Sequence, residues 1–560
     1  MATIVLLAGG AQTESGNTVV IEKDTGLIVQ VTPYGNITGI YDPNAAQYKS
    51  RAKAALFNHT LPLPSNDTRP VKIAPFNATK PRLPGAGTIE SGDTYDYGAV
   101  LGMSYLFYEA QRSGALPPTN PIPWREDSAL YDTAPDGSPL VGGSYDAGDN
   151  LILNFPAAFS TLLLVWGVLA FPDGYSAAGQ MENAIDTIRW HTDWYMKCHY
   201  RETRFVVMVG DPNTDHSYWI PPENMDMSRP AFEVGDNIPA SDVFGITSAA
   251  LSAAAQIFRA SDPDYAVQLI AHARDMYQVG VTYQGKHLPP VYRFKHTCKY
   301  SDGIPEAFVY TSSGYYDDLA MAAAWLYAYT GEQPYLDDAQ MWFSKVGYAG
   351  STFSWDDKSA GVALMLSLLL PNGPNQPFIQ QMEGFATAWE TGLYGVTITS
   401  RGLSFASEWG SLRYAMNAGF MTAVYAKSIN TFNAAGAARH ACWVRQQAGY
   451  VLGDTGRSFV VGYGNNPPVN PHHRAASCPG PRQPCGFDYF NSPSPNPHTL
   501  TGALVGGPYD AQDSYSDVRD NYQSNEVALD YNAGFTGVMA FLAGVAVPGG
   551  DSQVACAGLG

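Results

Sequence analysis

Two aspartates, Asp146 and Asp149, lie three residues apart in a glycine-rich stretch, residues 142–150 (GGSYDAGDN). Small residues let the backbone turn sharply there, so both carboxylates can reach one place. Two carboxylates in one cleft can share a water molecule, one acting as the ionised base and the other orienting the water. An acidic surface turn or a calcium-binding loop would explain the same spacing.

A glutamate far along the chain could supply an acid. Glu526 stands among aromatic and amide side chains in residues 515–533 (YSDVRDNYQSNEVALDYNA), just before a predicted helix. Partial burial beside Tyr531 would raise the pKa of Glu526 and keep it protonated. The stretch is strongly acidic, so a solvated surface loop is the alternative.

A third stretch, residues 458–474 (SFVVGYGNNPPVNPHHR), holds His472 and Arg474 in a loop stiffened by prolines. Such a pair can hydrogen-bond sugar hydroxyls and orient a carboxylate. No cysteine or acidic residue has zinc-type spacing here, so a metal site is less favoured. Because lone histidines are usually structural, this assignment depends on the other motifs.

Composition excludes several classes of partner. The 560 residues carry a net charge of −19, which argues against binding to nucleic acid or to anionic membrane surfaces. Aromatic residues make up 12% of the chain and suit the flat faces of sugars, although core packing is their commoner role. No segment has the roughly 20 consecutive apolar residues of a membrane span. A neutral polymer remains compatible with this charge.

The elements that must position these residues are predicted to be helices. Apolar residues recur at three- and four-residue spacing in twelve segments. The segments are residues 95–113, 156–170, 180–198, 241–260, 263–279, 316–330, 337–345, 358–370, 375–389, 411–429, 434–451 and 533–546. Six helical hairpins could close into a toroid or stack as an open solenoid, and the absence of a fixed-length repeat favours the closed barrel.

The first part of the chain differs. Residues 19–21 and 27–31 flank a turn and predict a hairpin, and residues 62–84 predict an extended connector rich in Pro, Asn and Thr. We therefore expect an N-terminal extension over residues 1–92 and a helical domain over residues 93–560. The extension is a small β module, a packing arm or a glycosylated linker. It holds four glycosylation sequons, at Asn36, Asn58, Asn66 and Asn77.

Cysteine usage agrees with an oxidising compartment. The chain has six cysteines, and Cys478 and Cys485 could close a local bridge in a loop rich in Pro and Gly. Free buried thiols are the alternative. Together with the clustered sequons, this favours a secreted protein.

In this order, the three motifs resemble glycoside hydrolase family 9, a family of inverting endoglucanases. Residues 515–533 fit its signature aromatic-x-Asp-x4-aromatic-x3-Glu-x-small-x3-Asn-small, and residues 464–474 fit Gly-x-Asn-x4-Pro-His-x-Arg. The resemblance runs from about residue 98 to residue 542. Further matching stretches are residues 111–117, 123–125, 215–219, 312–319, 354–358 and 409–414.

The resemblance implies an (α/α)6 barrel whose long loops form a cleft. It implies Glu526 as general acid and Asp149 as general base, with Asp146 helping to hold the water. His472 would bind the sugar beside the scissile bond, supported by Asp517. Inversion requires carboxyl groups about 6.5–9.5 Å apart. The residues implied to bind the sugar chain are Arg474, His216, Trp219, Trp409, Arg413, Tyr414 and Tyr531.

The resemblance also implies a structural calcium, although the chemistry itself requires no cofactor. Hard oxygen ligands from a loop and a helix start suit this ion. The alternative for the two acids at the helix start is simple compensation of the helix dipole. Asp318 stands where the family usually has Glu. In residues 151–156 (LILNFP) the family's usual Lys or Arg is lost, whereas Phe155 and Pro156 are kept. The implied ligands are Ser313, Gly314, Asp317, Asp318 and Asp357, the last being one acid of the pair at 356–357.

The expected function is therefore a secreted, monomeric endo-β-1,4-glucanase that hydrolyses cellulose and related β-glucans. A mixed-linkage β-glucanase and a processive cellulase are alternatives on the same scaffold. A non-catalytic glucan-binding protein is a further alternative, but a binder has no need for an acid and a base across one bond.

Overall fold

The computed structural model describes residues 18–21, 28–31, 37–41, 95–286, 310–371 and 373–545. The chain divides into two compact units, residues 1–68 and 69–560. In the first unit, β1 (Thr18–Ile21), β2 (Ile28–Val31) and β3 (Ile37–Tyr41) form an antiparallel sheet in that order. The strands expected to form a hairpin therefore pair with one another. The connector and the asparagines of the four sequons lie outside the described residues.

The second unit contains a long helix at each of the twelve predicted places. The bounds are α2 (Tyr97–Gln111), α3 (Asn154–Ala170), α5 (Met181–Cys198), α7 (Ser241–Phe258), α8 (Pro263–Thr282), α11 (Tyr316–Thr330), α12 (Gln333–Val346), α13 (Ser359–Leu369), α14 (Pro377–Thr391), α15 (Ser411–Ile429), α16 (Ala434–Leu452) and α20 (Leu529–Val545).

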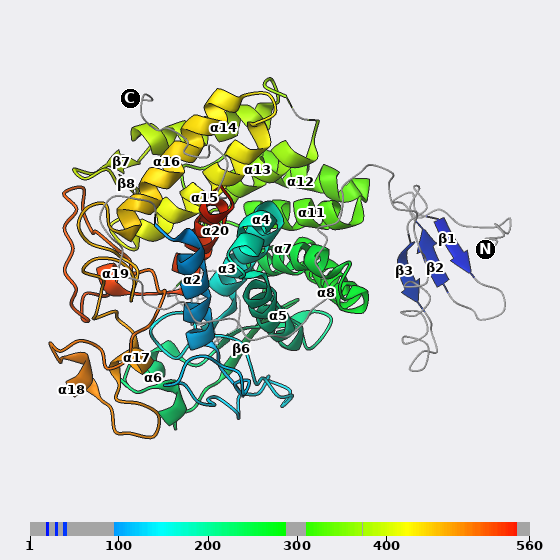
Figure 1. The fold of residues 1–560 in the computed structure, drawn as a ribbon. Coiled ribbons are helices and arrows are strands. Elements are labelled where there is room, and N and C mark those ends of the chain that lie inside the picture. The colour runs from blue at the N-terminus through cyan, green and yellow to red at the C-terminus, as the bar shows by residue number, and fades with distance from the viewer. Residues whose placement is uncertain are drawn as a thin grey trace. The chain divides into compact units, whose positions relative to one another are not determined.

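Six of these helices form a closed inner ring. Each contacts the next in the order α3, α7, α11, α13, α15 and α20, and α20 returns to α3. The other six lie outside this ring, each against an inner helix, as Figure 1 shows. The structure is therefore an (α/α)6 barrel, and the prediction of a closed toroid over a solenoid is confirmed.

The two rings differ in sequence. The inner helix α3 is almost entirely apolar, and all its residues from Asn154 to Val168 are buried. The outer helix α5 buries one face and carries charged residues such as Glu182 and Lys197 toward its ends. Helices buried on all sides need apolar residues all round, whereas surface helices need one apolar stripe. This difference places the core along the barrel axis.

A small sheet that the sequence did not predict carries part of the site. β4 (Ile152–Leu153), β5 (Arg204–Val209) and β6 (Ala231–Gly235) pair antiparallel in that order. β4 directly follows the loop of Asp146 and Asp149, and β5 leads into the short helix α6 (Pro212–Asp215). The sheet therefore holds two site loops side by side.

The predicted disulfide is present between Cys478 and Cys485, and Cys198 is a buried free thiol. Across the described part of the chain, every helix is too short or too polar to cross a lipid bilayer.

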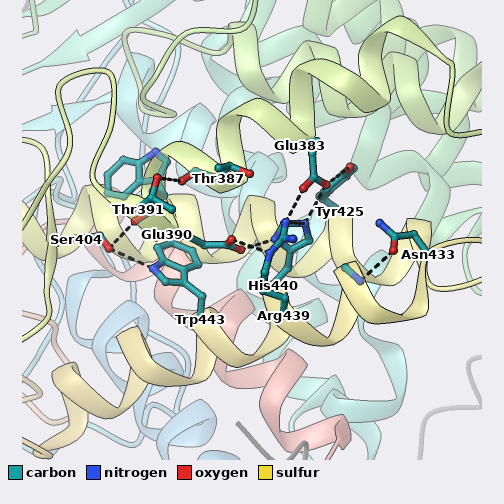
Figure 2. A network of polar contacts seen from close by, with 12 residues as sticks. Glu383, Thr387, Glu390, Thr391, Ser404, Tyr425, Asn433, Arg439, His440 and Trp443 are labelled. Carbon is teal, nitrogen blue, oxygen red and sulfur yellow. Dashed lines mark hydrogen bonds and ion pairs between the residues drawn. The ribbon is translucent and has the colours of Figure 1, made fainter. Parts of the chain in front are cut away.

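A buried histidine joins two outer helices. His440 of α16 lies between two carboxylates of α14: it hydrogen-bonds Glu390, and its Nε2 lies 3.2 Å from Oε2 of Glu383 (Figure 2). Tyr425 of α15 donates to the same Glu383 oxygen at 3.0 Å, and Arg439 contacts both glutamates. Burial lowers the pKa of His440, but the two glutamates outweigh it and raise this pKa. The network favours a charged imidazole.

We expect His440→Gln to destabilise the fold most in mildly acidic solution. The pKa of His440 is raised in the folded state, so its charged form contributes to the free energy of unfolding. This contribution is complete below about pH 6.5, the pKa in the unfolded chain, and is lost as the pH rises through the pKa in the folded protein. Breaking a buried ion pair costs about 3 kcal/mol. Denaturant unfolding at pH 6 and pH 9 measures the difference. An equal loss of stability at both pH values would contradict the charged state of His440.

Candidate active site

The loop of the two aspartates lies directly against the histidine loop. The carbonyl of Gly148 accepts a hydrogen bond from the backbone N–H of Arg474 at 2.9 Å. A Cβ atom at residue 148 would lie 2.0 Å from the carbonyl oxygen of His472, so only glycine fits. The backbone of His472 in turn forms an isolated parallel β-bridge with Glu526. Three segments far apart in sequence thus meet at one place.

Glu526 has the environment of a general acid. Nε1 of Trp409 donates to its Oε2 at 3.0 Å, and the hydroxyl of Tyr531 lies 3.3 Å from the same oxygen. Burial raises the pKa of Glu526 to about 7, helped by the charge of Asp149 and opposed by the hydrogen bond from Trp409. Glu526 can therefore hold a proton near neutral pH and donate it.

Asp149 has the opposite environment. Its Oδ2 lies 3.0 Å from Nε2 of His216, and its Oδ1 accepts a hydrogen bond from the backbone of Leu151 at 3.3 Å. Burial would raise the pKa of Asp149, but the hydrogen bond from His216 and the charge of Arg474 lower it below its usual value. Asp149 is therefore ionised, as a general base must be.

Asp146 is buried, and the charge of Asp149 acts on it. The hydroxyl of Tyr310 donates to its Oδ2 at 2.6 Å, and its backbone carbonyl accepts from Leu529 at 2.9 Å. Burial, followed by the charge of Asp530, raises the pKa of Asp146 well above its usual value. A neutral Asp146 can hold a water as a hydrogen-bond donor, which is a different role from that of a second carboxylate.

The histidine loop is held by backbone contacts. Nδ1 of His472 lies 2.8 Å from the carbonyl oxygen of Arg519, and the ring packs edge-on against Trp219 at 5.1 Å. Asp517 accepts hydrogen bonds from the backbone N–H groups of Val469 and Asn470 at 2.8 and 3.0 Å. Asp517 thus holds the backbone of the segment that leads to His472.

Arg474 is buried and its Nη1 donates to Oδ2 of Asp215 at 2.6 Å. The same aspartate lies next to His216 in the chain, and Nε2 of His216 is 3.9 Å from it. Arg474 and His216 therefore belong to one charged group around Asp149. Both were expected to contact sugar, and the structure places both beside Asp149.

The aromatic residues expected to bind sugar divide into exposed and buried ones. Trp409 is 43% exposed and packs against Tyr522 at 5.3 Å, which leaves a face for stacking. Trp219 is only 4% exposed, and its Nε1 donates to Ser477. Tyr531 is buried under Glu526. The buried pair therefore supports the walls of the site.

Arg413 is also buried. Its Nη1 pairs with Oδ2 of Asp530 at 3.0 Å, and its guanidinium lies over the rings of Tyr414 and Tyr531, 4.6 and 4.8 Å from their centres. Desolvation raises the pKa of Asp530, but Arg413 opposes that rise. This ion pair fixes Tyr531 and through it Glu526.

Sequence reasoning missed three residues of the site, namely Tyr310, Asp215 and Asp530. Asp215 and Asp530 lie inside the matching stretches 215–219 and 515–533, next to His216 and Tyr531, but no role was assigned to them. Tyr310 reaches Asp146 across 164 residues of sequence, and no local pattern marks such a contact.

Most of the residues expected to bind calcium line one hollow. Ser313, Gly314, Asp317 and Asp357 surround a space of about 240 Å³ together with Asp356. Oδ2 of Asp317 accepts from the backbone of Lys358 at 2.7 Å, and Oδ1 of Asp357 accepts from that of Ser359 at 2.9 Å. The hollow is therefore lined by carboxyl oxygens, which are the hard ligands that calcium prefers.

Asp318 does not share this hollow. Its Oδ1 pairs with Nζ of Lys358 at 2.8 Å, and both side chains are fully buried. The ammonium group also lies 4.5 Å from the ring centre of Phe155. The shorter acid at position 318 is therefore engaged by a lysine.

The chain is similar to known proteins. Residues 97–539 match the model of the family described as glycosyl hydrolase family 9. The chain belongs to glycosyl hydrolase family 9. The predicted family, barrel and glycoside hydrolase class are confirmed by this match and by the solved structures that resemble the chain.

Three relatives of this family 9 chain are informative. Endoglucanase B of Cellulomonas fimi is 38% identical over 80% of this chain. The matched part spans only 42% of the length of that protein. An endoglucanase structure from the termite Nasutitermes takasagoensis is 39% identical over 81% of this chain and all of its own, with a TM-score of 0.74. A C. cellulolyticum cellulase in complex with cellobiose is 32% identical over 80% of this chain and 99% of its own, with a TM-score of 0.71.

Proposed function

We propose that this family 9 protein is an endo-β-1,4-glucanase that cleaves by single-displacement inversion. One observation carries the proposal: two carboxyl groups on adjoining loops have pKa values shifted in opposite directions. The pKa of Glu526 is raised to about 7, and that of Asp149 is lowered. Glu526 protonates the glycosidic oxygen as its bond to the anomeric carbon breaks. Asp149 takes a proton from the water that attacks the opposite face of that carbon.

Anomeric NMR of the first products tests this mechanism. Inversion at a β-glucosidic bond releases the α-anomer first, before mutarotation equilibrates the products. We expect that signal within the first turnovers. Early appearance of the β-anomer would instead require a covalent glycosyl intermediate and would overturn the roles of both carboxyls.

The proposed substrate is the β-1,4-glucan chain of cellulose and related glucans. The names of the relatives and the cellobiose complex support a glucan. The exposed face of Trp409 beside Glu526 supports a stacked sugar next to the scissile bond. Mixed-linkage and processive action remain as alternatives. Product sizes and viscosity loss on carboxymethyl cellulose, crystalline cellulose and mixed-linkage glucan distinguish the three.

His216 is proposed to tune the base. A positive charge within hydrogen-bond distance lowers a carboxyl pKa by about one unit or more. We expect His216→Ala to raise the pKa of Asp149, so that activity is lost at a higher pH as the solution is acidified. The acidic limb of the kcat/KM profile should move up by about one unit. An unmoved limb with a raised KM would mean that His216 only binds sugar.

We propose that Ser313, Gly314, Asp317, Asp356 and Asp357 bind a structural calcium, without Asp318. We expect a chelator to lower Tm by several degrees and added Ca²⁺ to restore it. Asp357→Asn should remove this response. Asp318→Asn is the matched control: it should lower Tm by breaking the Lys358 pair yet keep the calcium response. Loss of the response in both variants would place Asp318 among the ligands.

The protein is proposed to be secreted and monomeric. The disulfide between Cys478 and Cys485 supports an oxidising compartment. Detection of the protein in culture medium and light scattering of the purified chain test the two statements separately.

A further inference from the structure

A further exposed aromatic ring lies beside the site, on the short helix α18 (Phe487–Phe490). The side chain of Phe487 is 46% exposed, and its ring centre lies 6.0 Å from that of Phe490 and 6.5 Å from that of Trp219. Phe490 is partly buried and packs against Trp219 at 4.7 Å. The ring of Phe487 is therefore supported by two aromatic side chains, and one of them, Trp219, also packs against His472.

These rings continue a series of aromatic contacts that begins at Trp409, the side chain that donates to the proposed general acid. Trp409 packs against Tyr522 at 5.3 Å, and Tyr522 is exposed. The ring of His472 lies 6.2 Å from that of Tyr522 and 6.0 Å from that of Phe490. Phe487 is the next ring in the series. The series therefore leads from the proposed acid, past His472, to an exposed ring that the family motifs do not contain.

One buried arginine holds both the loop of Phe487 and His472. The guanidinium of Arg519 donates, over 2.7 to 3.2 Å, to the backbone carbonyls of four residues of this loop: Tyr489, Phe490, Ser492 and Ser494. The carbonyl of Arg519 lies 2.8 Å from Nδ1 of His472. The disulfide of Cys485 closes the chain just before Phe487. A ring that is already held in place loses little conformational entropy when a ligand binds to it.

We propose that Phe487 stacks on a glucose residue of the bound glucan and forms a further sugar subsite beyond His472. A single exposed phenylalanine is ordinary on a protein surface. This one is held by a fixed loop and is joined to the site by aromatic contacts, which identifies the glucan chain as the occupant. The flat face of a sugar ring matches an exposed aromatic ring. The inference rests on the proposed glucanase activity, whose site it extends.

Calorimetric titration with cellohexaose tests this subsite in the full chain. Glu526→Gln is the background, so that the sugar is not hydrolysed during the measurement. We expect the added change Phe487→Ala to weaken binding about tenfold, because one apolar ring face is no longer buried by the sugar. Phe487→Leu keeps an apolar side chain at this position but has no flat ring, so it should weaken binding as well without disturbing the fold.

Phe432→Ala is the matched control for this measurement. Phe432 is 38% exposed and follows the end of α15, about 27 Å along that helix from Ser411 and the neighbouring Trp409. The same substitution there should leave the affinity for cellohexaose unchanged. An equal loss in Phe432→Ala and Phe487→Ala would show that the effect does not come from a local contact with sugar, and would overturn the proposal.

The outcomes separate this subsite from the function on which it rests. Unchanged affinity in Phe487→Ala would overturn the subsite alone, provided that the parent chain hydrolyses cellulose. A parent chain that hydrolyses no β-glucan would overturn both. Light scattering tests a second copy of the chain as the occupant. We expect monomers throughout, and a parent dimer that Phe487→Ala dissociates would overturn the proposal.

Discussion

Replacing Glu526 with Gln is expected to lower kcat on cellulose about 10³-fold with little change in KM. The amide keeps the hydrogen bond with Trp409 but has no proton to give to the departing sugar oxygen. Because the acid must be protonated and its pKa is about 7, the parent enzyme should lose activity as pH rises through that value. The variant should lack this alkaline limb.

A β-cellobioside with a dinitrophenol leaving group provides the control for this result. Such a leaving group departs without protonation, so Glu526→Gln should cleave it at close to the parent rate. A variant that is equally slow on both substrates would show that Glu526 does more than donate a proton, or that its loop has moved.

Replacing Asp149 with Asn is expected to lower kcat by a similar factor, about 10³-fold, on cellulose and on the activated substrate alike. Both reactions require a base for the water, and leaving-group ability does not replace it. The lowered pKa of Asp149 predicts that the parent enzyme keeps its base ionised in weakly acidic solution and loses activity only as pH falls through that value.

Asp520→Asn is the matched control for this variant. It changes an exposed aspartate in the loop that carries Asp517 and should leave kcat unchanged. Full recovery of Asp149→Asn on the activated substrate would contradict its role as base, because activation of the leaving group cannot supply a proton acceptor.

The helices could be predicted from the sequence because each depends on a local pattern. Apolar residues at three- and four-residue spacing marked all twelve long helices, and α3 showed its burial on every side by composition alone. The sheet of β4, β5 and β6 could not be found in this way. β4 has two residues, too few for alternation to appear, and its partners lie more than fifty residues away.

The site also has a part that the sequence predicts and a part that it does not. Asp149 and Glu526 stood out because their motifs are contiguous, but their surroundings come from elsewhere in the chain. Whether a tryptophan can stack on a sugar or packs inside the protein depends on which loops cover it. Trp409 and Trp219 carry the same side chain, and only the fold exposes the first and buries the second.

The contact between Gly148 and His472 determines how closely the loop of Asp149 approaches the segment of Glu526. The loop of Asp149 contacts the backbone of His472, which in turn forms a backbone bridge to Glu526. These contacts are between backbone atoms, so main-chain packing holds the two loops together. A methyl group at residue 148 would collide with the carbonyl oxygen of His472 and push the two loops apart.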